Sequence, residues 1–194
     1  MITLLTDFGS DSFQTVRSRT WLALNCPEEK VLDISHSIHA NDINEAAYIF
    51  RLVLDQFQTD TVHILAIDFD QRAKNPEVIY FKYKGQHILT YNSGMASILL
   101  EQQTNEVVTV GNYTSNHYDS VISCFGEKAK QLLLGQLSDQ KSLIPDQLNI
   151  KTVLNPVSSE KMLHGHVVYF DALGTCYTNI SQNEFEAFVD GVAF

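Results

Sequence analysis

The sequence is poor in cysteine and has no long apolar run. Three cysteines, Cys26, Cys124 and Cys176, stand far apart among 194 residues. An odd number of widely spaced cysteines predicts buried thiols, not a disulfide framework or a Cys-x-x-Cys metal site. The longest apolar runs, such as 121–125, fall far short of the roughly 20 residues that a membrane span needs. Asp7 comes too early for a secretory signal, so we expect no membrane partner and a cytoplasmic location.

Basic residues are also scarce. The chain has 13 Lys and Arg against 23 Asp and Glu, which gives a formal charge of −10. Binding to nucleic acid needs clustered Lys and Arg to neutralise phosphates, and the sequence has no basic stripe. We therefore expect no nucleic-acid partner. What is present is 44% hydrophobic residues, enough to bury a core in one domain, or in one domain with a smaller appendage.

The chain opens with an apolar stretch that runs into the polar turn Thr6-Asp7-Phe8-Gly9. This pattern predicts a strand that ends near Asp7, with Gly9 freeing the backbone to bend. Ligands of open α/β sheets bind outside the carboxyl ends of strands, so Asp7 is a candidate to bind a hydroxyl or an amine. The alternative is that Asp7 or Ser10 simply caps the next helix. This stretch alone leaves both interpretations open.

Helix and strand patterns alternate after this turn. Apolar residues at helical spacing predict helices at 12–24, 42–54, 95–101 and 121–134. Short apolar or alternating runs predict strands at 30–34, 61–67, 78–83, 87–91 and 106–110. The expected buried stripe of the first helix contains Phe13, Val16, Trp21, Leu22 and Leu24. In the second helix, Asp42 is expected to be the cap and Glu45 to complete a capping box. The predicted fold class is α/β, with a central, mostly parallel sheet flanked by helices.

The pattern loosens between Ser138 and Asn155, and we place a domain boundary there. Residues 1–145 are expected to form the α/β domain and residues 146–194 a small, β-rich carboxy-terminal segment. A hairpin is predicted within 165–180. A single hairpin with a short helix is not stable alone, so this segment must lean on the first domain or on another subunit.

Five segments, taken in order, resemble one known family. They are Thr6-Asp7-Phe8-Gly9, residues 32–38, Asp42-Ile43 with Ala46-Ala47, Thr61-Val62-His63 leading to Asp68, and Asp171 through Gly174 to Thr178-Asn179-Ile180. None is specific alone. In register over most of the chain they resemble the S-adenosyl-L-methionine (SAM) hydroxide adenosyltransferase family, hydrolases that form adenosine and are related to the fluorinase and chlorinase enzymes. The resemblance implies an α/β domain, a smaller β domain, and homotrimers that bind SAM between one subunit's first domain and a neighbour's second.

The resemblance also assigns positions in the site. The implied substrate-binding residues are Asp7, Phe8, Asn92, Ser93, Asp171 and Thr175, and the implied catalytic residues are Asp68 and Arg72. Asp7 would hold the ribose hydroxyls, a suitable task for an acceptor-only carboxylate facing a vicinal diol. Asp68 matches the family's acid at the nucleophile site, and Asp171 matches the acid near the methionine amine. No cofactor and no metal are implied, and SAM is the substrate.

The implied reaction is the hydrolysis of SAM to adenosine and L-methionine, by attack of water or hydroxide on ribose C5′. Methionine leaves the sulfonium as a neutral thioether, which needs little acid assistance. The protein's task is therefore to align the nucleophile opposite sulfur and to remove its water shell.

The sequence departs from the family pattern at several positions. The run after Asp68 lacks the family's Pro-Gly-Val-Gly and Arg pair, and Arg72 stands only four residues on. The family's histidine aligns near Ser120, with His117 displaced, and residues 173–175 replace its Phe-Gly-Asn. The chain is also shorter than members generally are. A second hypothesis is therefore a catalytically inactive member that binds an adenosyl or nucleoside ligand, or that serves only as an assembly subunit.

Two histidine groups raise the question of a metal ion. His36, His39 and Asp42 have a spacing that could hold a metal on a helix, but the segment has the pattern of a strand end and a loop. His164 and His166 would share one strand face without a third ligand. Neither group leads us to expect a metal site.

Overall fold

The computed structural model describes residues 1–68, 77–100, 106–112, 118–138, 140–153, 155–159 and 161–189. The chain divides into two compact units, Met1–Lys151 and Thr152–Phe194. The division lies six residues beyond the boundary expected after residue 145.

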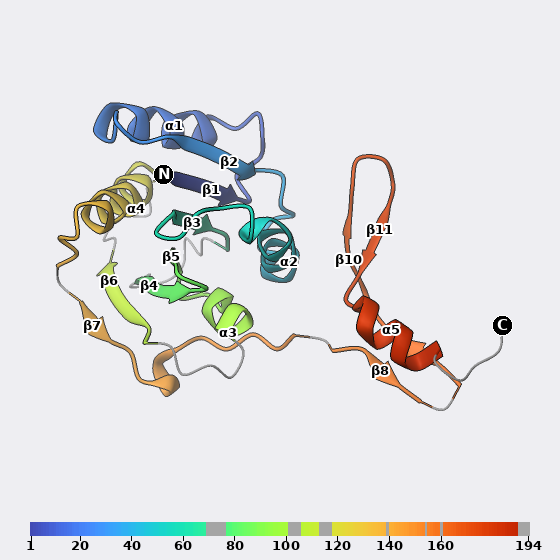
Figure 1. The fold of residues 1–194 in the computed structure, drawn as a ribbon. Helices are drawn as coiled ribbons and strands as arrows, with labels where there is room; N and C mark the ends of the chain where they lie inside the picture. The colour runs from blue at the N-terminus through green and yellow to red at the C-terminus, as the bar shows by residue number, and fades with distance from the viewer. Residues whose placement is uncertain are drawn as a thin grey trace. The chain divides into compact units, whose positions relative to one another are not determined.

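Strands and helices alternate along unit 1 (Figure 1). Its strands are β1 (Ile2–Thr6), β2 (Val31–Ser35), β3 (Val62–Ala66), β4 (Glu77–Tyr83), β5 (Gln86–Tyr91), β6 (Val108–Asn112) and β7 (Lys141–Ser142). Its helices are α1 (Phe13–Asn25), α2 (Ile43–Leu54), α3 (Met95–Leu100) and α4 (Tyr118–Leu133), followed by the 3-10 turn η1 (Pro145–Gln147). Every predicted helix and strand of this unit is confirmed, with ends shifted by at most three residues. The short strand β7 is an addition that the pattern did not predict.

The strands form one mixed sheet in the order β2-β1-β3-β5-β4-β6-β7. β2, β1, β3 and β5 are parallel, whereas β4, β6 and β7 pair antiparallel. Helices α1 and α4 pack on one face, and α2 and α3 lie together on the other (Figure 1). The predicted α/β fold is therefore confirmed. Its antiparallel part begins at the tight β4–β5 turn, where Lys84 (φ 47°) and Gly85 (φ 78°) are both left-handed, as a two-residue hairpin requires.

Strands β1 and β3 are buried along their whole length. Helices cover both faces of the sheet here, which explains why the two strands have nearly continuous apolar sequences. One group of buried side chains extends from β1 and β3 to β5, β6 and α4. It includes Leu4, Ile64, Leu89, Val110 and Phe125. The buried centre of the sheet thus leads directly to the carboxyl ends of β1 and β3.

The predicted buried stripe of α1 is right for Leu22, which is buried, and for Trp21, which packs against the core, but wrong for the other three residues. Phe13 (60% exposed), Val16 (62%) and Leu24 (75%) face away from the core, whereas the small residues Thr15 and Ser18 are buried. The Ser18 hydroxyl donates to the Gln14 carbonyl of the same helix (2.8 Å), so its burial leaves no polar group unsatisfied. The buried face of α1 therefore combines Leu22 with the small residues Thr15 and Ser18.

Both of the first two helices begin at a polar cap, and the cap of α2 is the predicted Asp42. Ser12 caps α1 by accepting from the Gln14 amide (3.1 Å), and Asp42 caps α2 by accepting from the Glu45 amide (2.9 Å). The buried Glu45 carboxylate, however, accepts from the His39 amide (2.8 Å) instead of returning to Asp42. The predicted capping box is therefore only half formed, because Glu45 holds the loop before the helix.

Unit 2 consists of short elements. They are β8 (Val157–Ser158), β9 (Leu163–His164), β10 (Val167–Phe170), β11 (Cys176–Thr178) and α5 (Gln182–Val189). β10 and β11 pair antiparallel, which confirms the predicted hairpin, and β8 pairs with β9. Every described residue of unit 2 is at least partly exposed. Cys26 is buried and Cys124 half-buried, but Cys176 is exposed, so the predicted burial is wrong for Cys176.

Among the described residues, no helix combines the length and the apolar character that crossing a membrane requires.

Candidate functional site

Asp7 and Asp68 come together at the carboxyl edge of the sheet. Asp7 follows β1 and Asp68 follows the neighbouring parallel strand β3. Asp7 Oδ2 accepts from the Asp68 amide (3.2 Å) and from the Asn41 amide (2.9 Å). With β2 on one side of β1 and β3 on the other, the chain reverses its direction across the sheet at β1. Open α/β sheets form their ligand clefts at such a reversal.

The two amides that Asp7 receives belong to residues in left-handed backbone conformation. Asn41 has φ 64° and Asp68 has φ 62°. Asn and Asp adopt this conformation more readily than other non-glycine residues, but it still costs free energy. The half-buried Asp7 carboxylate offsets part of this cost through Oδ2, while Oδ1 has no hydrogen-bond partner in the described part of the chain. The alternative in which Asp7 or Ser10 only caps α1 is wrong, because Ser12 is the cap.

The turn that carries Asp7 is tied to the loop after β2. The Gly9 amide donates to the His36 carbonyl (2.7 Å), and the hydroxyls of Ser10 and Ser37 are hydrogen-bonded (2.6 Å). Gly9 itself has φ 93°, a conformation that strains any residue with a Cβ atom. The loops after β1 and β2 therefore form one connected rim beside Asp7.

The histidines of this rim have separate partners. Buried His36 contacts Thr6 through Nδ1 (2.8 Å), whereas His39 Nδ1 lies 2.9 Å from Glu45 Oε2. The hydrogen bond with Glu45 raises the pKa of the exposed His39 above its ordinary value. Of the three residues whose spacing suggested a metal, His36 thus contacts Thr6, whereas His39 and Asp42 both bond to Glu45, through its carboxylate and its amide respectively.

Asn92 holds the segment that follows η1. Its side-chain nitrogen donates to Glu77 Oε2 (3.0 Å) and to the Gln147 carbonyl (2.9 Å), and its Oδ1 accepts from the Asn149 amide (3.0 Å). The predicted ligand-binding amide is thus engaged within unit 1. The neighbouring Ser93 Oγ is buried and has no hydrogen-bond partner among the described residues.

Asp171 shapes the β10–β11 turn in unit 2. Its Oδ1 accepts from the amides of Leu173 (2.9 Å) and Thr175 (2.8 Å), and its Oδ2 accepts from the Tyr177 hydroxyl (3.3 Å). These bonds, the one from the Thr175 backbone most of all, hold the pKa of Asp171 below its usual value. The structure therefore brings the predicted residues Asp171 and Thr175 together in one turn.

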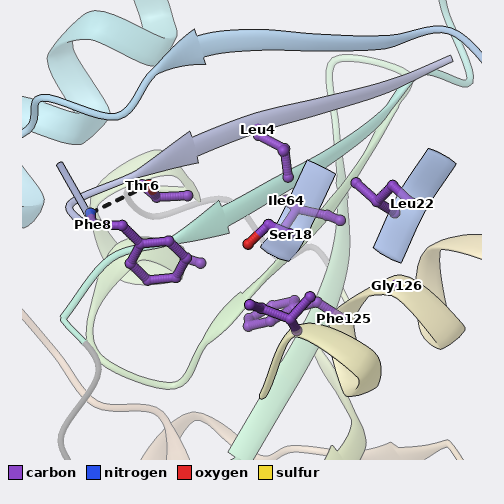
Figure 2. Close-up of a pocket in the computed structure, with 10 residues that line it drawn as sticks. Leu4, Thr6, Phe8, Ser18, Leu22, Ile64, Phe125 and Gly126 are labelled. Atoms are coloured by element: carbon purple, nitrogen blue, oxygen red, sulfur yellow. Dashed lines mark hydrogen bonds between the residues drawn. The ribbon is translucent and has the colours of Figure 1, made fainter. Parts of the chain in front are cut away.

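Phe8 faces the helices α1 and α4. Its ring packs against the buried group that includes Phe125 and lines an apolar cavity between the two helices and the sheet. The cavity has about 310 Å³ of empty space, counted with the open solvent at its mouth. Figure 2 shows its lining, with Phe8 and Leu22 on opposite sides of the labelled group in this view. A ligand that contacts the Phe8 ring, as predicted, would have to reach this face of the sheet.

The predicted catalytic Arg72 lies outside the described residues, as does the displaced candidate His117. Of the two predicted catalytic residues, Asp68 is the one that the structure describes. Its backbone lies next to Asp7.

Comparison with known families agrees with this geometry. Residues 2–130, two thirds of the chain, match the model of the SAM hydroxide adenosyltransferase N-terminal domain. The chain belongs to the SAM hydroxide adenosyltransferase family. The match spans β1, β2 and β3, and so it contains both Asp7 and Asp68.

Solved structures show the same fold. An uncharacterized conserved protein from Thermotoga maritima superposes with a TM-score of 0.78 at 20% identity, covering 100% of this chain and 76% of its own. A conserved hypothetical protein from Thermus thermophilus gives a TM-score of 0.67 at 17% identity, covering 92% of this chain and 71% of its own. No curated protein matches the sequence significantly.

Sequence reasoning missed two residues of this family member's rim. Asn41 supplies the shorter hydrogen bond to Asp7, and His36 holds the turn that carries it. Asn41 stands just before the helix cap Asp42, in a loop where Asn commonly adopts a left-handed conformation, and this was the available signal. For His36 the available signal was its position just after the predicted strand at 30–34.

Proposed function

We propose that this protein binds SAM at the carboxyl edge of β1 and β3 and hydrolyses it to adenosine and L-methionine. The main support for the proposal is that the two oxygens of the Asp7 carboxylate have different surroundings. One oxygen is held by two backbone amides, and the other has no partner among the described residues. A carboxylate held in this way is pre-organised to accept hydrogen bonds from the two hydroxyls of a ribose.

The charge of the protein and the placement of Asp68 support the same ligand. SAM carries a sulfonium cation, and the formal charge of −10 favours the approach of a cationic ligand. The Asp68 backbone touches the Asp7 carboxylate, so a ribose held by Asp7 would lie close to Asp68. In the proposed reaction Asp68 orients the water that attacks C5′. The C5′–O bond forms as the C5′–S bond breaks, methionine leaves as a neutral thioether, and the proton of the water passes to solvent.

The test is incubation of the purified protein with SAM, followed by chromatography of adenosine and methionine. We expect both products in equal amounts above a control without protein. Asp68→Asn should lower kcat by about 100-fold, the usual effect of removing a group that orients or activates the attacking water. Asp7→Asn should raise KM by about 10-fold, because it presents an amide donor where the ribose needs an acceptor.

Asp11→Asn is the matched control, since Asp11 is an exposed acid four residues beyond Asp7. It should leave both kinetic constants unchanged. If wild-type protein forms no adenosine above the control, the proposed hydrolysis is wrong.

A second candidate function is nucleoside binding without turnover. It is favoured by the internal engagement of two predicted ligand contacts, because Asn92 holds residues 147–149 and Asp171 holds its own turn. Titration calorimetry with adenosine separates the two functions. Adenosine binding without SAM cleavage supports this candidate, whereas turnover rejects it.

A further inference from the structure

A buried threonine and histidine hold both ends of the turn that carries Asp7. Thr6 Oγ1 lies 2.8 Å from His36 Nδ1, and the two side chains are 1% and 7% exposed. Thr6 Oγ1 also accepts from the Phe8 amide (3.3 Å; Figure 2), and the His36 carbonyl accepts from the Gly9 amide (2.7 Å). Thr6 directly precedes Asp7, and the two amides that directly follow Asp7 both donate to this pair.

The partners of His36 determine where its proton lies. His36 Nε2 is 3.3 Å from Asp33 Oδ1, and Arg19 Nε is 3.2 Å from the other oxygen of Asp33. Nε2 and Asp33 Oδ1 are both buried, and neither atom has a hydrogen-bond partner in the described part of the chain, so their 3.3 Å contact is electrostatic. Because a carboxylate can only accept, the contact with Asp33 favours the Nε2–H tautomer of the neutral ring, in which Nδ1 accepts from the Thr6 hydroxyl. The lone pairs of Thr6 Oγ1 are then left for the Phe8 amide.

We propose that His36 is a positioning residue, which acts through Thr6 to keep the Asp7 carboxylate aimed at the ligand. This rests on the proposed function of Asp7 in holding ribose. With the Thr6 hydroxyl committed to His36, the turn has one arrangement, in which Asp7 Oδ2 meets the Asn41 and Asp68 amides and Oδ1 stays available. A displacement of about an ångström is enough to lose most of the benefit of such a pre-organised group.

The same strand contains a matched control pair. Thr3 Oγ1 lies 2.6 Å from Nδ1 of buried His63, whose Nε2 pairs with Gln86 Oε1. Both pairs join a β1 threonine to a buried imidazole, but His63 packs against Phe50 and Phe57 below the edge of the sheet. Removing the hydroxyl of either threonine should therefore cost similar stability, and only the Thr6 change should reach the Asp7 turn.

The experiment compares Thr6→Val with Thr3→Val, since valine preserves the shape of threonine and removes its hydroxyl. Adenosine binding is measured by calorimetry, and thermal unfolding reports the stability of each variant. We expect Thr6→Val to weaken adenosine binding by about 3- to 10-fold, the equivalent of one hydrogen bond, and Thr3→Val to change it less than twofold. Equal weakening by both variants would overturn the proposal.

Two conservative variants of His36 test the direction of the effect. The Asn side-chain amide lies near the Nδ1 position of histidine, and that of Gln lies near Nε2. His36→Asn keeps an acceptor for Thr6 and should retain more adenosine affinity than His36→Gln, which keeps only the contact to Asp33. Nitrogen NMR of the wild-type protein should show the Nε2–H tautomer of His36. The Nδ1–H tautomer, or the reverse order of the two variants, would contradict the proposal.

Hydrogen exchange of ligand-free protein separates this inference from the proposed function. Thr6→Val should accelerate exchange of the Asn41 and Asp68 amides by about 3- to 10-fold, and Thr3→Val should not. If wild-type protein binds neither adenosine nor SAM, the proposed function fails while the exchange rates still decide the positioning. If exchange of these amides is unchanged by Thr6→Val, the positioning by His36 is wrong, whatever the protein binds.

Discussion

The Asp68 amide nitrogen lies 3.2 Å from Asp7 Oδ2, which joins residues 61 positions apart in the chain. The same oxygen accepts from the Asn41 amide at 2.9 Å. One carboxylate thus connects the loops after β1, β2 and β3 at the edge where ligands bind in sheets of this kind. Asp7 therefore has a structural task before any ligand arrives, and the two tasks can be separated by mutation.

We expect Asp7→Ala to lower the free energy of unfolding by about 1–3 kcal/mol, because two amides in left-handed conformation lose a charged acceptor. Asp7→Asn should lower it by less than about 1 kcal/mol, since its carbonyl oxygen can still accept both amides. Urea unfolding measures both values, and Asp11→Ala should stay within about 0.5 kcal/mol of wild type. Equal losses for Asp7→Ala and Asp7→Asn would show that the two amides contribute little.

Stability should depend on pH through His63. Burial lowers the pKa of His63 to about 4, from 6.5 in the unfolded chain. Between these values the unfolded chain takes up a proton that the folded protein excludes. The contribution of His63 to stability is therefore complete above pH 6.5 and is lost as the pH falls towards 4, by about 3 kcal/mol. Urea unfolding at pH 7, 5.5 and 4.5 measures this loss.

The variant His63→Gln should lose this contribution to the slope of stability against pH. The control His164→Gln should keep it, because His164 is exposed in unit 2. If the slopes of wild type and His63→Gln coincide, protonation of His63 does not limit stability in acid.

The bonds between Asn92 and Asn149 should hold the segment before unit 2 in place. Asn149→Ala removes the side-chain bond to the Asn92 carbonyl, and Asn92→Ala removes the bonds to Glu77, Gln147 and the Asn149 amide. We expect both variants to be cleaved faster by a protease between residues 147 and 153, with Asn92→Ala the faster of the two. The exposed Asn44→Ala serves as the control. Cleavage of all three at the wild-type rate would show that the segment is held by other contacts.

Helices α1 and α4 should tolerate no added methyl group where Trp21 crosses Gly126. A Cβ atom at Gly126 would overlap the Trp21 ring, so Gly126→Ala should destabilise the protein by about 1–3 kcal/mol. Trp21 is the single tryptophan, and its fluorescence should shift in the same variant. Adding Trp21→Leu should recover part of the loss, because the two changes share one contact. Strictly additive losses would contradict this packing.

The helices and strands of unit 1 were predictable because their signals are local. The tight turn at Lys84-Gly85, the cap at Ser12 and the apolar run of β3 each depend on a few neighbouring residues. The buried face of α1 was predictable only in part. Its position depends on the approach of Trp21 to Gly126, and these residues lie on helices separated by most of unit 1.

The candidate site divides in the same manner. That acids follow β1 and β3 could be inferred from the sequence, because a polar turn after an apolar strand is a local pattern. The internal roles of Asn92 and Asp171 could not, since a side chain that satisfies its own fold has the same sequence pattern as one that awaits a ligand. The half-formed capping box is a further example, because the Glu45 carboxylate accepts from the His39 amide and not from the Asp42 amide.

The sequence by itself determined the α/β class, the family and the location of Asp7 and Asp68 at strand ends. Only the tertiary structure decided that Asp7 receives the amides of Asn41 and Asp68, residues 34 and 61 positions away. The physical reason is the order of the sheet. Those amides meet one carboxylate because β2 and β3 pair on opposite sides of β1, and pairing between distant strands leaves no local pattern in the chain.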